Sequence, residues 1–297
     1  MNLAPTLLLI LYCVAIASFS LMGGLLPNWV KMTHTRTQLA MSFVSGLMLG
    51  VAFYHLLPHS VGMLGGAGAV DASVQWLVFG LIVMLLLLRL FHFHQHDFSH
   101  EEKKLRDHPR SQAHDHGHDH QHGHGHEHGY SANRMSWVGI ALGLGVHTLI
   151  DGIALGAVML GEISDGATGV VGVGVFLAIL LHKPLDAMSI TTVMAAGGWS
   201  QQAQATNNLL FALMCPLGAL LFFYGVDLLG DSADYVVAAA LAFSAGAFIC
   251  IALSDLLPEV HFHSHDRGKL TLAFLLGIAL AYGIGALEPA SFHLSNH

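Results

Sequence analysis

Two short segments of the sequence each place a histidine four residues before an aspartate. The first pair is His147 and Asp151, and the second pair is His182 and Asp186. Residues four apart in a helix lie on one face, so each pair would direct an imidazole and a carboxylate to the same side. Together the pairs offer two nitrogen and two carboxylate ligands, enough for a four-coordinate zinc site. Both pairs lie in apolar surroundings, where ionisable side chains are costly and mark function.

The ligand types favour reversible binding of a divalent cation. Thiolates would hold zinc tightly, and neither segment contains a cysteine. Two carboxylates balance a dication, whereas the empty site carries two negative charges. Lys183 follows His182 and is a candidate charge partner for the carboxylates; the alternative is that it extends away from them. Pro184 has no backbone N–H, so we expect a kink or a local opening of its helix.

Two Leu-Leu-Pro segments carry further polar residues. His55 and His59 flank the first of these segments, and Asp255 and Glu259 occupy the same places around the second. We interpret the histidines as the entry and the acids as the exit of a cation pathway. The alternative is that all four are ordinary polar residues at helix ends.

The composition places these residues in a membrane. The 297 residues are 54% hydrophobic and only 10% charged, whereas soluble domains carry about 25% charged residues. The net charge is −8, and the 11 Lys and Arg lie almost entirely in short loops, so we expect no nucleic-acid partner. The cysteines Cys13, Cys215 and Cys250 form no CxxC pair, and a disulfide framework is not expected.

Eight apolar segments are long enough to cross a bilayer, which takes about 20 residues. Lys and Arg lie between segments 1 and 2, 3 and 4, and 7 and 8, and none lies in the loops after segments 2, 4 and 6. The positive-inside rule then places both termini outside the cytosol. We expect a multi-pass protein of the plasma (cell inner) membrane. The segments span roughly 4–25, 38–58, 73–91, 135–160, 167–195, 204–226, 234–258 and 269–288.

A His-rich stretch separates segments 3 and 4. Thirteen of the 23 histidines lie between His92 and His128, and the stretch lacks the apolar residues of a core, so we expect disorder on the cytosolic side. We divide the chain into helices 1–3 (1–91), this loop (92–133) and helices 4–8 (134–297), within one membrane domain overall. The loop residues expected to bind metal are His114, His116, His118, His120, His122, His124, His126 and His128.

An internal repeat relates segments 2 and 7. Residues 45–59 and 245–259 share Gly, Leu-Leu and Pro at the same spacing. The expected topology makes the two segments antiparallel, as in the inverted repeats of alternating-access transporters. The alternative is two similar helix ends that each contain a proline.

Together these motifs resemble the ZIP (zinc/iron-regulated-transporter-like) family. The resemblance implies an all-α membrane protein of eight helices, in which the motifs of helices 4 and 5 form the transport site and the metal moves into the cytosol. It also implies an elevator-like motion of helices 1, 4, 5 and 6 against helices 2, 3, 7 and 8. The segments that carry the resemblance are His147 to Gly156, His182 to Asp186, His55-Leu-Leu-Pro, and Asp255 to Glu259.

The sequence also departs from the family pattern. The family often has Asn after the helix 4 histidine and an acid after the helix 5 histidine, where this chain has Thr148 and Lys183. His59 stands where the family usually has Glu. A second metal position therefore lacks two ligands, and we expect one metal held by the two His and two Asp residues.

Two other classes of protein remain as alternatives. A cation diffusion facilitator also uses two His-x-x-x-Asp pairs, but it exports zinc and resembles a six-helix protein with a soluble C-terminal domain. A membrane metallohydrolase would need an open zinc position and a general acid or base. We favour a transporter that is not an enzyme and has no organic cofactor. Zinc is the expected substrate, with iron, manganese and cadmium as alternatives; the expected partners are the ions and the lipid bilayer, and a homodimer stays open.

Overall fold

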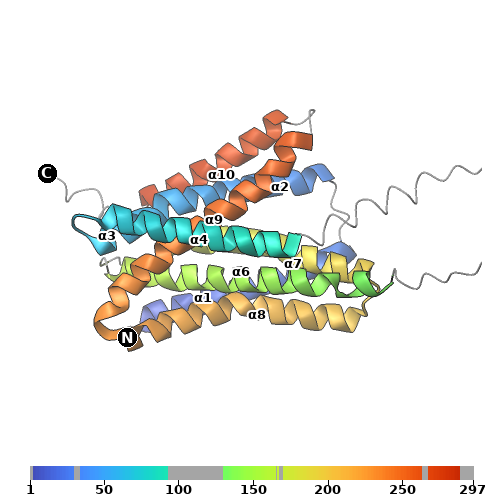
Figure 1. The fold of residues 1–297 in the computed structure, drawn as a ribbon, viewed down its shortest axis with the longest axis horizontal. Coiled ribbons are helices and arrows are strands. Elements are labelled where there is room, and N and C mark those ends of the chain that lie inside the picture. Colours follow the sequence, from blue (N-terminus) through green and yellow to red (C-terminus); the bar gives the residue numbers. More distant parts are fainter. Residues whose placement is uncertain are drawn as a thin grey trace, which may run out of the picture.

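The computed structural model describes residues 3–29, 34–92, 130–164, 166, 170–262 and 267–287. Within these ranges the chain is helical apart from short turns, which confirms the all-helical prediction (Figure 1). In chain order the elements are α1 (Leu3–Trp29), α2 (His34–Val51), η1 (Ala52–Leu56), α3 (Leu57–Leu64), α4 (Ala69–His92), α6 (Tyr130–Ser164), α7 (Val173–Ala196), α8 (Gln201–Gly225), η2 (Val226–Ser232), α9 (Ala233–Phe262) and α10 (Arg267–Leu287).

The second helix continues past the proline at which the sequence suggested an end. Residues Ala52–Leu56 form a π-helical turn, and Leu57 donates its N–H to the carbonyl of Ala52. Pro58 then lies in the first turn of α3, which runs to Leu64. Proline has no N–H to donate to the carbonyl four residues earlier, and a wider turn is one way for a helix to accommodate it. The expected end at residue 58 was therefore wrong by about two turns.

Seven stretches of the described residues are long and apolar enough to cross a membrane. The longest, Gln201–Ser254, has 54 residues and contains α8, the short 3-10 helix η2 and part of α9. The chain changes direction there at Gly230, whose φ of 55° belongs to the left-handed region that glycine adopts readily. The sequence-based division into eight segments separates α8 from α9 at this turn.

The helices pack as two groups. In the first group α1 lies along α7 and α8, and α6 lies along α8; in the second, α2 packs on α10, and α4 and α3 pack on α9. The two groups meet mainly where α6 lies against α9 and α2 lies against α7. In Figure 1, α1, α6 and α8 run along the lower half of the molecule, α2 and α10 run together along the upper half, and α9 crosses obliquely from the lower to the upper half.

Glycines let helix backbones touch inside each group. A methyl group added at Gly152 of α6 would lie 2.2 Å from the carbonyl oxygen of Cys215 on α8. One added at Gly23 of α1 would lie 2.2 Å from the Cα of Pro184 on α7. Backbone atoms cannot move aside as a flexible side chain can, so these positions require glycine. Small residues allow the same close approach in other membrane helix pairs.

The glycines of the internal repeat make equivalent contacts. Gly46 of α2 and Gly246 of α9 hold the same place in the two repeats, and a methyl group on either would clash with a carbonyl of a neighbouring helix, at 2.0 and 1.9 Å. In both helix pairs the contact is reciprocal. Each helix contributes one glycine, and this glycine faces a backbone carbonyl of the partner helix, three residues before the partner's own glycine. The facing pairs are Gly46 with Phe274, Gly277 with Phe43, Gly246 with Leu77, and Gly80 with Phe243.

Candidate metal centre

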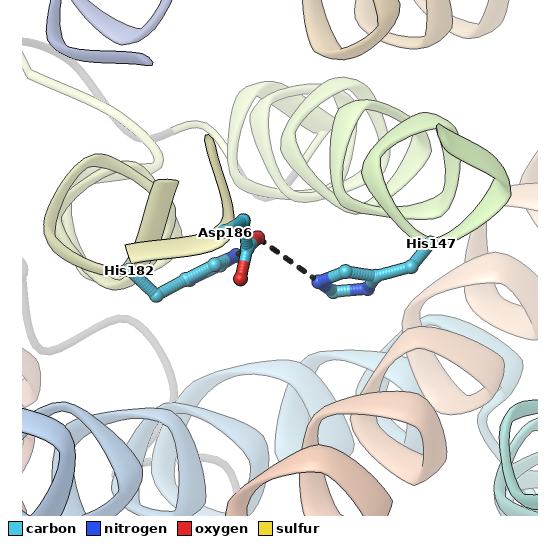
Figure 2. Close-up of side chains that lie close together, drawn as sticks. All are labelled: His147, His182 and Asp186. Carbon is cyan, nitrogen blue, oxygen red and sulfur yellow. Dashed lines mark ion pairs between the residues drawn. The ribbon is translucent and has the colours of Figure 1, made fainter. Parts of the chain in front are cut away.

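Side chains from α6 and α7 converge where the two helices pack together. His147 and His182 are buried, and Nε2 of each ring points at the carboxylate of Asp186, with Oδ2 at 3.6 and 3.7 Å (Figure 2). One ligand atom from each of these three residues lies within 4.8 Å of the others. The i,i+4 spacing of His182 and Asp186 puts both on one face of α7, so the two helices supply a shared set of donors.

Asp151 completes this set from α6. Its Oδ2 lies 3.4 Å from His147 Nε2 and 3.2 Å from His182 Nε2. Four nitrogen-to-oxygen distances between 3.2 and 3.7 Å therefore link the two imidazoles to the two carboxylates. Tetrahedral ligands about 2.0–2.1 Å from zinc lie roughly 3.3 Å from one another. These four nitrogen-to-oxygen distances are close to the edge length of such a tetrahedron.

The histidine rings are oriented as ligands would be. Nδ1 of His182 lies 2.8 Å from the carbonyl of Ala178, which can only accept, so Nδ1 donates its hydrogen. Nε2 also lies within hydrogen-bonding distance of Oδ2 of Asp151, at 3.2 Å. A ring that keeps the Nδ1 hydrogen and gives up the one on Nε2 presents the Nε2 lone pair to a metal, an arrangement common among metal-binding histidines. Neither ring nitrogen of His147 has a hydrogen-bond partner among the described residues, although the ring is buried. Nε2 faces the carboxylates of Asp151 and Asp186 at 3.4 and 3.6 Å, and a cation held between these three groups would give this nitrogen a direct partner.

Lys183 lies against both carboxylates. Its side chain is 1% exposed, and Nζ donates to Oδ2 of Asp151 and to Oδ2 of Asp186 at 3.3 Å. A third hydrogen bond of 3.0 Å reaches Oγ1 of Thr148, which donates to the carbonyl of Leu144. An ammonium has three N–H donors, and all three have acceptors here. The centre therefore contains a fixed positive charge beside its two carboxylates.

Elements beyond α6 and α7 cover the centre. The ring of Phe211 on α8 lies 5.7 Å from Nζ of Lys183, within range of a cation–π interaction. Phe248 on α9 meets the ring of His182 edge-on, with centroids 6.5 Å apart. The sequence did not predict that either phenylalanine would contact the centre, because an apolar residue in an apolar helix does not stand out.

Helix α7 continues through Pro184 without a break, where the sequence predicted a kink or a local opening.

The other predicted site residues lie elsewhere or outside the described part. His55 is buried on η1, where Nε2 is 2.9 Å from the carbonyl of Ala281, and His59 on α3 is half-buried with Nδ1 2.8 Å from the carbonyl of His55. Neither belongs to the cluster formed by α6 and α7. The side chains of Asp255 and Glu259, and the loop residues His114 to His128, fall outside the described residues.

The sequence reading overlooked one buried acid. Glu162 on α6 is 4% exposed, and its Oε2 accepts the N–H of Gly172 at 2.9 Å. It lies eleven residues after Asp151, which is close to three full helical turns. A search for acids at helical spacing from the His-x-x-x-Asp pair would have found it.

Comparisons with known proteins agree with the motifs. Residues 6–285 match the family model described as ZIP Zinc transporter. The chain is 32% identical over 169 residues to zinc transporter ZIP9 of Micropogonias undulatus, covering 54% of this chain and 53% of the relative. It is 36% identical over 140 residues to zinc transporter ZIP9-B of Xenopus laevis, covering 45% of each. The matched region thus spans about half the length of these curated relatives.

Proposed function

Because the chain belongs to the ZIP zinc transporter family, we propose that it carries zinc into the cytosol through the centre between α6 and α7. The observation that carries this proposal is the convergence of two imidazole nitrogens and two carboxylate oxygens, 3.2 to 3.7 Å apart, within a buried part of the chain long and apolar enough to cross a membrane. Family membership sets aside both a cation diffusion facilitator and a metallohydrolase. The centre then binds its ion as cargo and performs no reaction on it.

The proposed topology has eight crossings. A single helix of 54 residues would be about 80 Å long, whereas the hydrocarbon core is about 30 Å thick. The stretch Gln201–Ser254 turns at Gly230, so α8 and α9 are best understood as separate crossings. With the Lys and Arg distribution, this topology places both termini outside and the His-rich loop in the cytosol.

The exposure of the ligands supports release toward the cytosol. Asp186 is 21% exposed, while the other three ligands are at most 6% exposed. Of the two ligands on α7, Asp186 is the one nearer to the end of the helix at Ala196. The proposed topology places that end of α7 on the cytosolic side. In the proposed topology, the ligand that is most accessible therefore lies toward the cytosolic end of the centre.

The packing supports movement of one helix group against the other. Within each group, glycines such as Gly152 and Gly46 approach backbone atoms so closely that the helices cannot slide. Between the groups, the described glycines meet side chains instead. A methyl group at Gly161 of α6 would lie 3.4 Å from side-chain atoms of Met63 and Leu241. Side chains can change rotamer, so the boundary between the groups is the natural plane for an elevator-like step.

Lys183 limits the proposed centre to one metal. A second dication sharing the carboxylates would sit roughly 4 Å from the first, and buried charges repel strongly at that separation. The Lys183 ammonium already contacts Oδ2 of Asp151 and Oδ2 of Asp186, the same oxygens that face the imidazoles. It offsets one of the two negative charges of the centre and leaves room for a single dication.

Uptake by purified protein in vesicles tests the proposal. The unmodified chain should carry zinc into proteoliposomes that contain a zinc-sensitive dye, and Asp151→Ala should lose nearly all uptake because it removes a ligand. Asp234→Asn, an exposed acid in the first turn of α9, is the matched control and should transport normally. Equal uptake by Asp151→Ala and the unmodified chain would contradict the proposal.

A further inference from the structure

The imidazole of His55 packs on a glycine from the other helix group. His55 is buried on η1, which directly follows α2. A methyl group added at Gly174 of α7 would lie 3.1 to 3.2 Å from Cε1, Nδ1 and Nε2 of the ring. Nearly equal distances to three ring atoms place this methyl group over the face of the imidazole, not beside its edge. Glycine at position 174 therefore lets the backbone of α7 lie flat against the ring.

The ring is anchored to its own helix group. Nε2 lies 2.9 Å from the carbonyl of Ala281 on α10, and a carbonyl can only accept, so Nε2 donates. A glycine of α10, Gly285, also faces the ring, because a methyl group there would lie 3.4 Å from Cε1 and 3.5 Å from Nε2. The ring therefore belongs to the group that contains α2 and α10, and its contact with Gly174 joins that group to α7.

In the proposed topology this contact lies on the extracytoplasmic side of the metal centre. Gly174 is the second residue of α7, which begins at Val173, and it precedes His182 by eight residues. At a rise of about 1.5 Å per residue, the contact is about 12 Å from His182 along the helix axis. The two helix groups are therefore joined on the side of the centre from which an ion arrives.

We propose that the His55 ring is a latch, which holds α7 in the present arrangement through Gly174 and releases it when the helix groups slide to load an ion. This inference rests on the proposed transport function and its elevator-like step. Because the ring is anchored to α10, it cannot follow α7, and a slide of one helical turn, about 5.4 Å, carries Gly174 off its face. A contact made in only one of two arrangements favours that arrangement. His55 is then a positioning residue of the transport cycle.

A distance measurement between the helix groups tests the latch without relying on transport. Spin labels are attached at Val70→Cys on α4 and Val170→Cys just before α7, which are 59% and 66% exposed and belong to different groups. The native cysteines are buried and do not compete for the label. Pulsed electron paramagnetic resonance then gives the distance distribution in liposomes. Gly174→Ala adds a methyl group to the face of the ring from the other group, and the matched control Gly285→Ala adds one from the same group.

Gly174→Ala should shift the ratio of the two distance populations roughly fivefold away from the present arrangement, whereas Gly285→Ala should leave the ratio unchanged. In a His55→Ala background the ring is absent, so Gly174→Ala should add no further shift.

Three results would overturn the latch: an unchanged ratio in Gly174→Ala, an equal shift in Gly285→Ala, or a full further shift in the His55→Ala background. A lower melting temperature of Gly174→Ala with an unchanged ratio would show that Gly174 serves packing alone. Absence of zinc uptake by the unmodified chain would instead count against the proposed function.

Discussion

Removal of the Lys183 charge should tighten zinc binding. Lys183→Met keeps the length of the side chain, and the new thioether would lie beside Phe211, 5.7 Å from the present ammonium. Thr148 keeps its hydrogen bond to Leu144, so no buried donor is left unpaired. The substitution therefore isolates the electrostatic effect of the ammonium on a metal bound between α6 and α7.

The magnitude follows from the shared ligand atom. Zinc about 2 Å from Oδ2 of Asp151, with the ammonium about 3 Å from the same oxygen, gives a separation of at most about 5 Å. At an effective dielectric constant near 20, a dication and a single positive charge repel by about 7 kcal/mol at this distance. Rearrangement around the two uncompensated carboxylates offsets much of this, and we expect a tenfold to hundredfold gain in affinity, or about 1.4 to 2.8 kcal/mol.

Competition against a chromophoric chelator in detergent measures this affinity. Lys183→Arg keeps the charge and serves as the control, with an affinity close to that of the unmodified protein. Turnover by Lys183→Met should fall, because tighter binding slows release to the cytosol. Equal or weaker zinc binding by Lys183→Met would refute the view that the ammonium opposes the metal.

Three further predictions concern the ligands, the packing and the loop. His182→Ala should lower zinc affinity at least a hundredfold in the same competition assay, while the protein stays folded in the membrane. Gly23→Ala forces a methyl group to within 2.2 Å of Pro184 Cα and should lower the melting temperature by several degrees; Gly283→Ala, which meets nothing within 4 Å, should leave it unchanged. Deletion of His114 to His128 should preserve uptake and lower the number of zinc ions bound per chain; loss of uptake by the folded deletion would show that the loop belongs to the transport machinery.

The central residues were accessible from sequence because their signal is local. His and Asp at i,i+4 lie on one face of any helix, and an ionisable pair stands out in an apolar segment. The family resemblance read from these motifs is confirmed by the match over residues 6–285. The pairing of α6 with α7 needed only that the two motifs lie on consecutive helices.

Other features depended on packing that no short pattern reports. Pro58 suggested a helix end, but a π-helical turn lets the chain continue into α3. Phe248 contacts His182 from a helix more than sixty residues away in sequence. The sequence left two orientations open for Lys183, because both are compatible with its place after His182; the contacts with Asp151 and Asp186 depend on how α6 and α7 approach each other.

Anomalous diffraction from crystals soaked in zinc or cadmium tests the central claim most directly. We predict one strong peak between α6 and α7, bound by His147, Asp151, His182 and Asp186. Crystals of Lys183→Glu provide the positive control, since the added carboxylate should admit a second metal. Two full peaks about 4 Å apart in the unmodified protein, or no peak among these four residues, would contradict the account.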